Sequence, residues 1–337
     1  MRYQLNIVGA SLAGLALAGA SAAAEPLSLN YDDLAFIEAP IAKEMHGFTV
    51  SAKQLYDAGF RRNTEKGTTE FVLRGTFETS VEKQLESAVT IGATLNINVD
   101  AESMALNRIK NRNRAAAYLR SVYGLVSAGS VGDMTKEATR RLRGTGNGML
   151  YNDGHLGTPD ELGLAYQARL SAYVGTIVAD KDGRFDVGVS YERPAATIDR
   201  RLTLRGTRGS FQSADNSTTM DTLALSVVGE IIYGRLRIDG SLGAERLKGG
   251  RVEADRYFAS AGVFYKKGKV TVSAEGLYGQ TDGVTDTSLA LGARYDIAKG
   301  ISLNAGVNKL KSDGHVDGVR LFDHDKTEAR VSARYEF

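Results

Sequence analysis

Strict alternation of apolar and polar residues is the feature of this sequence that most constrains its fold. Between Val89 and Asp100 one set of alternate positions is apolar, and the other set is polar or glycine. Side chains of a β-strand point to opposite faces in turn, so this stretch predicts a strand with one apolar and one wet face. The pattern recurs at Glu70–Glu78, at Leu162–Val178 and in pairs of stretches from Arg184 to Phe337. The chain is therefore predicted to be all-β.

The spacing of the turns predicts how many strands there are. Short turns, such as Tyr233-Gly234 and Lys299-Gly300, alternate with longer polar connections, among them Arg61–Gly67, Ala101–Arg114, Arg193–Thr219 and Lys311–Lys326. Five strands are expected before Ser130 and nine after it, which gives 14. If Arg193–Thr219 forms two short strands, the total is 16. An even number places both chain ends on the same side of a closed sheet.

The N-terminus has the pattern of an export signal. Residues 1–24 combine a basic start at Arg2, an apolar run and an Ala22-Ala23-Ala24 cleavage site, which together predict a secretory signal peptide. Residues 25–337 then form one domain, in which residues 25–47 are a lead-in without clear periodicity. No later stretch approaches the roughly 18 apolar residues of a spanning helix. The formal net charge of +2 argues against a nucleic-acid partner.

An exported, alternating chain has two main folds open to it. A soluble β-sandwich also alternates, but the even apolar faces here favour a transmembrane antiparallel β-barrel in the bacterial outer membrane, in contact with its lipid and lipopolysaccharide. The four prolines fall outside the predicted strands, at positions 26, 40, 159 and 194. Lipid requires a closed sheet, because an open edge leaves backbone groups unpaired.

One long segment, Ser130–Asp160, interrupts the alternation. It contains six glycines, Pro159, and charged residues of both signs. A long irregular segment inside a regular fold is usually functional or disordered. We expect residues 130–160 to fold into the lumen and to narrow the pore. The charged residues expected at this constriction are Asp133, Glu137, Arg140, Arg141 and Arg143.

Three stretches resemble the general diffusion porins of Gram-negative outer membranes, in an alphaproteobacterial-like form. They are Tyr118–Gly129 before the long segment, Leu162–Tyr166 after it, and the C-terminal Arg334-Tyr335-Glu336-Phe337. The resemblance implies 16 strands, a homotrimer, passage of small hydrophilic solutes, and an inward loop whose acids face a basic ladder on the wall. It also implies that Tyr335 and Phe337 form the signal read by the outer-membrane assembly machinery.

The alternation also predicts which charges face the lumen. Arg74 and Arg169 are the wall residues expected at the constriction, among a larger set of arginines on polar faces that includes Arg235. Rings of charge in a narrow pore determine which ions pass. The alternative is that these charges pair across neighbouring strands and only stiffen the wall.

Other motifs carry weaker signals. Gly144-Thr145-Gly146-Asn147-Gly148 resembles a phosphate-binding loop but lacks the Lys-Ser/Thr and the helix that follow one, so a flexible loop is expected. The acidic stretches Asp180–Asp186, expected in a tight periplasmic turn, and Asp313–Asp325 leave room for weakly bound Ca²⁺. A hydrolase using His155 is an alternative without a nucleophile motif.

Together these patterns predict no catalytic residue, no metal site and no cofactor. The predicted function is a porin whose water-filled channel lets small hydrophilic solutes and ions diffuse passively. The alternative is a plugged outer-membrane barrel with a structural or surface-binding role.

Overall fold

The computed structural model describes residues 41–85, 88–102, 109–131, 144–150, 154–159, 162–193 and 198–337. The predicted signal peptide and most of the predicted lead-in lie outside this range. The first nine strands are β1 (Ile41–Met45), β2 (Phe48–Asn63), β3 (Thr68–Gln84), β4 (Thr90–Glu102), β5 (Ile109–Ser121), β6 (Gly124–Ser130), β7 (Leu162–Leu170), β8 (Tyr173–Asp180) and β9 (Phe185–Arg193). The others are β10 (Ile198–Gln212), β11 (Thr219–Tyr233), β12 (Leu236–Gly249), β13 (Val252–Lys267), β14 (Val270–Thr281), β15 (Val284–Ala298), β16 (Ile301–Val316) and β17 (Val319–Glu336).

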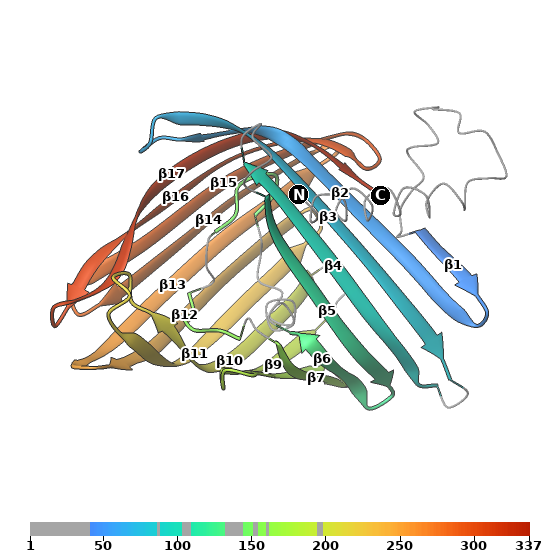
Figure 1. The fold of residues 1–337 in the computed structure, drawn as a ribbon, viewed down its shortest axis with the longest axis horizontal. Coiled ribbons are helices and arrows are strands. Elements are labelled where there is room, and N and C mark those ends of the chain that lie inside the picture. Colours follow the sequence, from blue (N-terminus) through green and yellow to red (C-terminus); the bar gives the residue numbers. More distant parts are fainter. Residues whose placement is uncertain are drawn as a thin grey trace, which may run out of the picture.

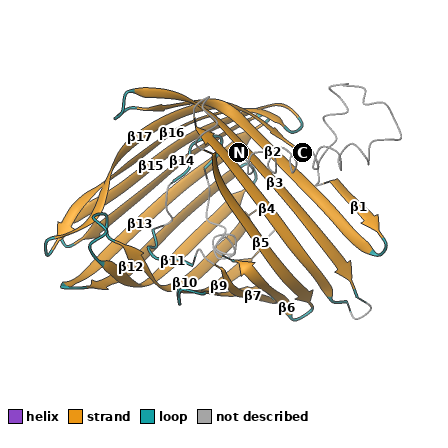
Figure 2. Cartoon of the chain, in the orientation of Figure 1, coloured by secondary structure: helices purple, strands orange, loops and turns teal. Residues whose placement is uncertain are grey.

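Strands β2 to β17 form a closed antiparallel barrel of 16 strands (Figures 1 and 2). The last strand closes it, because β17 pairs with β2 from Glu328–Asn63 to Glu336–Leu55. Phe337 and Gln54 then exchange two backbone hydrogen bonds of 2.8 and 3.0 Å. Strand β1 pairs with Phe48–Ala52 of β2. This stretch of β2 precedes Leu55–Asn63, with which β17 pairs. Within the described part of the chain, no helix is long and apolar enough to cross a membrane.

The predicted total of 16 strands is confirmed, but the route to it was wrong. Arg193–Thr219 contributes the single strand β10 rather than two short ones. The other strand comes from Leu162–Val178, which is divided into β7 and β8 by a turn at Ser171 and Ala172. Ser171 has a φ of 54°, which lies in the left-handed region that two-residue hairpin turns use.

The stretches predicted as long polar loops are largely strand. The chain remains extended from Lys311 to Val316 and again from Val319, with a turn of two residues between them. Arg61 also lies in a strand, β2. The Asp180–Asp186 turn lies at the same end of the barrel as the segment joining β6 to β7, so its predicted periplasmic position was wrong. The strands thus continue past the point where one face stops being apolar.

The outer face of the barrel carries a band of exposed apolar side chains. On β11 this band runs from Leu223 to Tyr233, about the length of a tilted membrane strand of roughly 9–11 residues. Exposed tyrosines gather where the strands turn at the end that holds the C-terminus: Tyr173, Tyr191, Tyr233, Tyr265 and Tyr295. Outer-membrane barrels place aromatic residues at the membrane interfaces in this way.

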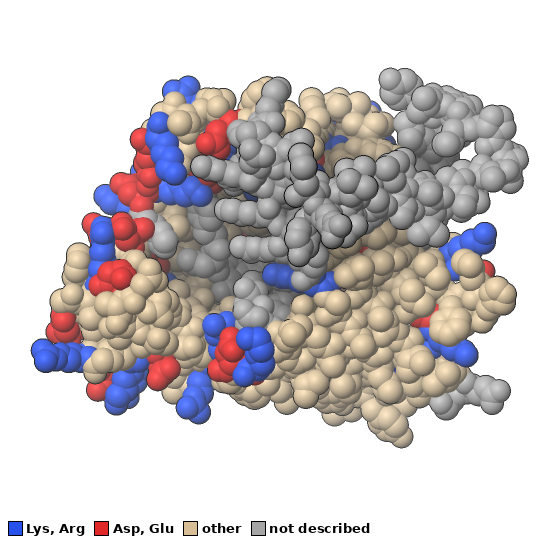
Figure 3. Space-filling view, in the orientation of Figure 1, with Lys and Arg blue, Asp and Glu red and all other residues tan. Residues whose placement is uncertain are grey.

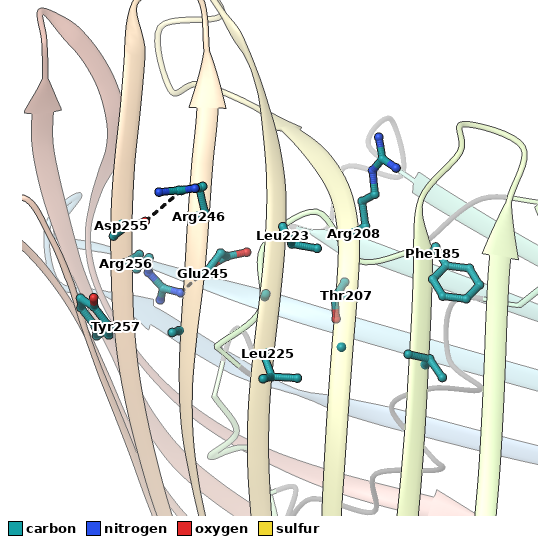
Figure 4. A pocket seen from close by; sticks show the side chains of 14 residues that line it. Phe185, Thr207, Arg208, Leu223, Leu225, Glu245, Arg246, Asp255, Arg256 and Tyr257 are labelled. Atoms are coloured by element: carbon teal, nitrogen blue, oxygen red, sulfur yellow. Dashed lines mark hydrogen bonds and ion pairs between the residues drawn. The ribbon is translucent and has the colours of Figure 1, made fainter.

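Charges begin on the outer face directly above that band. Figure 4 shows Arg208, Arg246 and Asp255 on the side of a shallow outer groove nearest the strand turns, with Leu223 and Leu225 below them. In the space-filling view, charged residues gather at one end of the barrel and the wall beside them is largely uncharged (Figure 3). The outer surface therefore fits a hydrocarbon layer bounded by water.

Candidate functional site

The structure describes three parts of the segment between β6 and β7, namely residues 131, 144–150 and 154–159. Residues 144–150 and 154–159, named here the docked segment, lie within the barrel in Figure 1. The side chains that it contacts define the inner face. On β8 to β17 that face is rich in small buried hydroxyls, among them Thr176, Thr203, Ser226, Ser241, Ser260, Ser273, Ser288, Ser302 and Ser332.

The glycine-rich stretch 144–150 is fixed to β14, β16 and β17. The amide of Thr145 donates to Ser273 Oγ at 2.8 Å, and the amide of Gly144 donates to Glu275 Oε2 at 3.0 Å. Asn147 Nδ2 donates to Ser332 Oγ at 2.9 Å, while Asn308 Nδ2 donates to the Asn147 carbonyl at 3.0 Å. These bonds secure both backbone and side chains of the stretch to the wall.

Glycine is required here because the backbones almost touch. A Cβ on Gly148 would lie 1.9 Å from the carbonyl oxygen of Leu291, and one on Gly146 would lie 2.1 Å from that of Ala293. Gly146 also has a φ of 60°. The stretch is therefore a docked element and neither a phosphate cradle nor the flexible loop that the sequence predicted.

A second anchor, residues 154–157, lies against β10 to β13. The ring nitrogens of His155 lie 2.6 Å from Ser226 Oγ and 2.8 Å from Thr207 Oγ1, and the ring meets Phe258 edge-on at 5.2 Å. The Leu156 amide donates to Glu245 Oε1 at 3.0 Å. His155 and Ser226 are both buried, so this histidine fixes the segment to the wall, and the hydrolase alternative gains no accessible nucleophile from it.

Buried ion pairs on the inner wall hold the second anchor through Arg256. Arg256 lies 3.0 Å from Glu245 and 2.8 Å from Asp286, and its Nη1 donates to the Gly154 carbonyl at 2.6 Å. Figure 4 shows the Arg256–Glu245 pair. On the neighbouring strands, Arg205 makes a two-pronged contact with Asp186, the closest approach being 2.6 Å. Charges on this wall therefore pair across strands, as the wall-stiffening alternative expected.

The opposite part of the wall carries charges that remain more exposed. Register places Arg334, Asp57, Arg74 and Asp100 side by side on β17, β2, β3 and β4. Asp57 is buried and lies 3.1 Å from both Arg330 and Arg334. Arg74 pairs with Asp100 at 3.1 Å, yet their side chains are 47% and 43% exposed. This row of alternating charge lies on the inner face of the wall, away from the strands that hold the docked segment.

Of the residues predicted to form the constriction, the structure describes only Arg74 and Arg169. Asp133, Glu137, Arg140, Arg141 and Arg143 lie outside the described residues. Arg74 lies on the inner wall, in the charged row. Arg169 contacts Glu192 and stands next to the β7–β8 turn, at the end of the barrel that holds the C-terminus. The aromatic rings of Tyr335 and Phe337 at the C-terminus pack together where the barrel closes, with centroids 5.2 Å apart.

Several wall residues were missed by the sequence reasoning. Arg61, which pairs with Glu70 at 2.8 Å, was assigned to a loop, and Arg201 and Arg205 lie in a connection that was expected to form either a loop or two short strands. Arg235 was expected on the lumen face of a strand but lies in the turn before β12. Alternation along β10 would have identified two of them. Every second position of this strand carries a buried residue: Arg201, Thr203, Arg205 and Thr207.

The acidic stretches hold internal contacts. Asp180 Oδ1 accepts the amides of Asp182 and Arg184, each at 3.0 Å. In the Asp313–Asp325 stretch, Arg320 pairs with Asp313 at 3.2 Å and with Asp323 at 2.8 Å. Among the described residues, no group of three or more His, Asp or Glu is arranged to hold a metal ion.

Comparison with solved structures identifies the fold. The barrel is similar to an anion-selective porin from Comamonas acidovorans, with a TM-score of 0.63 and 12% identity over 86% of this chain and 100% of that one. It is similar to OmpT of Vibrio cholerae, in a trimer form, with a TM-score of 0.64 and 11% identity over 86% and 100%. A mutant of the Rhodopseudomonas blastica porin gives a TM-score of 0.54 and 15% identity over 86% and 100%. No family model and no curated protein sequence matches the chain.

Proposed function

We propose that this protein is an outer-membrane porin, a water-filled channel for passive diffusion of small hydrophilic solutes and ions. The fold is shared with outer-membrane porins, and the apolar outer band with its tyrosine belt suits a barrel that crosses a membrane. The trimer form named for the OmpT structure makes a homotrimer the natural assembly to test.

One observation carries the proposal. Residues 144–150 and 154–159 are anchored to the β10–β17 wall, where inner side chains such as Arg256 and Asp286 are buried. On the far wall, Arg74 and Asp100 remain nearly half exposed. A segment held against one wall narrows a barrel without filling it, and the exposed charges then border the remaining channel. Such a channel selects solutes by width and by the field of its wall charges.

The test is conductance in planar bilayers with purified, folded protein, together with swelling of liposomes in isotonic arabinose. We expect stepwise conductance and rapid swelling from protein whose gel migration changes on heating, and neither from the same sample after boiling. Absence of conductance at every voltage from folded protein would refute the channel.

The plugged barrel remains the second candidate, because an apolar cluster lies on the inner face near one mouth. The same experiment separates the two functions: a plugged barrel folds, shows the heat-dependent gel shift and conducts nothing. Replacing Arg140, Arg141 and Arg143 together by alanine tests the predicted constriction, with the reversal potential in a salt gradient as readout. Anion preference should fall if these arginines border the pore.

A further inference from the structure

The hairpin formed by the ends of β16 and β17 leaves the barrel wall. Pairing of β16 with β15 ends at Ser312–Asp286, and pairing of β17 with β2 ends at Glu328–Asn63. Beyond these points the two strands continue to pair with each other up to Val316–Val319. The described pairing of residues 313–326, named here the outer hairpin, is therefore with itself, so the barrel sheet does not fix its direction.

The outer hairpin reaches the turn between β10 and β11, which is not its neighbour in the sheet. The Ala214 amide donates to the Arg320 carbonyl at 3.0 Å, and the Arg320 amide donates to Asp215 Oδ2 at 3.4 Å. Strands β12 to β15 lie between these two elements along the wall. In Figure 1 the red hairpin and the β10–β11 turn lie at the same end of the barrel. The outer hairpin therefore crosses part of this mouth, from the β16–β17 side of the wall to the β10–β11 turn.

Apolar side chains hold it there. Val316, Leu321 and Phe322 are buried in one cluster with residues from the ends of β11 to β13 at this mouth, namely Met220, Leu247, Val252 and Ala254. The Phe322 ring lies parallel to that of Phe211 on β10, with centroids 6.4 Å apart. Leu156 of the docked segment also packs against the cluster. Apolar residues on the inner face of a watery mouth are favourable only when covered, and the outer hairpin covers them.

The bend has a local cause. A register shift between Gly314 and His315 marks a bulge, and bulges bend and twist a strand. A Cβ on Gly314 would lie 1.9 Å from Cγ1 of Val284 on β15. Glycine at this position lets the hairpin cross directly over Val284 as it turns inward.

We infer that the outer hairpin is a second, fixed constriction that limits the size of the solutes entering the channel. It acts at the mouth and in series with the docked segment, and it excludes larger hydrophilic solutes such as trisaccharides more strongly than ions or pentoses. This inference rests on the proposed channel function, since it concerns the width of that channel.

The decisive variant removes residues 314–322 and joins Asp313 to Asp323 through Asn-Gly, which forms a two-residue hairpin turn. If two constrictions in series have comparable resistance, removing one raises single-channel conductance by up to about twofold. Liposome swelling in raffinose should increase more than swelling in arabinose. The matched control replaces residues 64–67, in the β2–β3 turn at the same end, by Asn-Gly and should change neither readout.

Two further variants keep the test independent of the deletion. L321S/F322S removes the apolar contact and should shift the raffinose-to-arabinose ratio in the same direction. A214C/R320C joins the two elements in a chain with no other cysteine, and oxidation should leave conductance at the wild-type level. A deletion variant that conducts with the wild-type size ratio, or an oxidised double-cysteine variant with reduced conductance, would overturn the inference. Failure of the wild type to conduct would instead overturn the channel itself.

Discussion

Replacing Arg256 by methionine tests whether a buried network of ion pairs holds the docked segment against the wall. Arg256 is fully buried and holds Glu245 at 3.0 Å, Asp286 at 2.8 Å and the Gly154 carbonyl at 2.6 Å. Its loss leaves two carboxylates buried without their cation. Breaking a buried pair by removing one partner typically costs about 3–5 kcal/mol of unfolding free energy.

The same two strands supply the control. Arg246 and Asp255 are the sequence neighbours of Glu245 and Arg256, and they form an ion pair of 3.3 Å on the outer face. Their side chains are 61% and 55% exposed. An exposed pair contributes roughly 0.2–1 kcal/mol, so R246M should have little effect. Figure 4 shows the two pairs on adjacent residues of β12 and β13.

The assay is equilibrium unfolding of the barrel in lipid vesicles by urea, followed by the gel shift between folded and unfolded forms. We expect R256M to lower the midpoint strongly and R246M to lower it slightly. The triple variant R256M/E245Q/D286N should recover part of the loss, because it no longer buries unpaired charge. Equal losses for R256M and R246M, or no recovery in the triple variant, would refute the reasoning.

Three further predictions follow from the lumen and the mouth. G148A places a methyl group 1.9 Å from the Leu291 carbonyl and should displace the docked segment, seen as noisier channel current, whereas G175A, with nothing within 4 Å, should behave as wild type. R74A should shift the reversal potential in a KCl gradient toward cation preference, because Asp100 then faces the channel without its partner; an unchanged potential would place Arg74 away from the ion path. Hydrogen bonds from Ser217 and Ser213 lower the pKa of Asp215 below its ordinary value of 3.8, so its bond to the outer hairpin is at full strength above that pH and is lost only as the pH falls through the lowered pKa. The raffinose-to-arabinose ratio should therefore stay constant from pH 7 to pH 5, and a change within that range would contradict the assignment.

The faces of the strands were predictable because alternation is a local property of extended backbone. Val89–Asp100 was expected to have one apolar and one wet face, and in β4 Ile91, Ala93 and Leu95 are exposed while the residues between them are partly buried. The turn at Ser171 was missed because it contains no glycine, proline or asparagine. A phase change does mark it: the exposed large apolar residues are Leu162, Leu164, Tyr166 and Leu170 before the turn, at even positions, and Tyr173 and Ile177 after it, at odd positions.

The long polar connections were misassigned for a different reason. Beyond the apolar band the outer face of a strand also meets water, so the outer apolar set disappears while backbone pairing continues. Lys309 and Lys311 begin such a stretch on β16, and Asp323 and Asp325 belong to its partner on β17. The length of an alternating apolar and polar stretch therefore indicates how much of a strand lies in the membrane, and not how long the whole strand is.

By itself, the sequence determined which side chains face outward and which face the lumen wherever an outer apolar set is present, since each residue's side depends only on its immediate neighbours. It also marked the segment at Ser130–Asp160 as the one that breaks the pattern. Only the tertiary structure decided where that segment docks: Asn147 meets Ser332, and Arg256 meets Gly154. These partners come together because the sheet closes on itself and places distant strands around a single lumen. A period of two residues encodes the face of a strand but not what lies across from it.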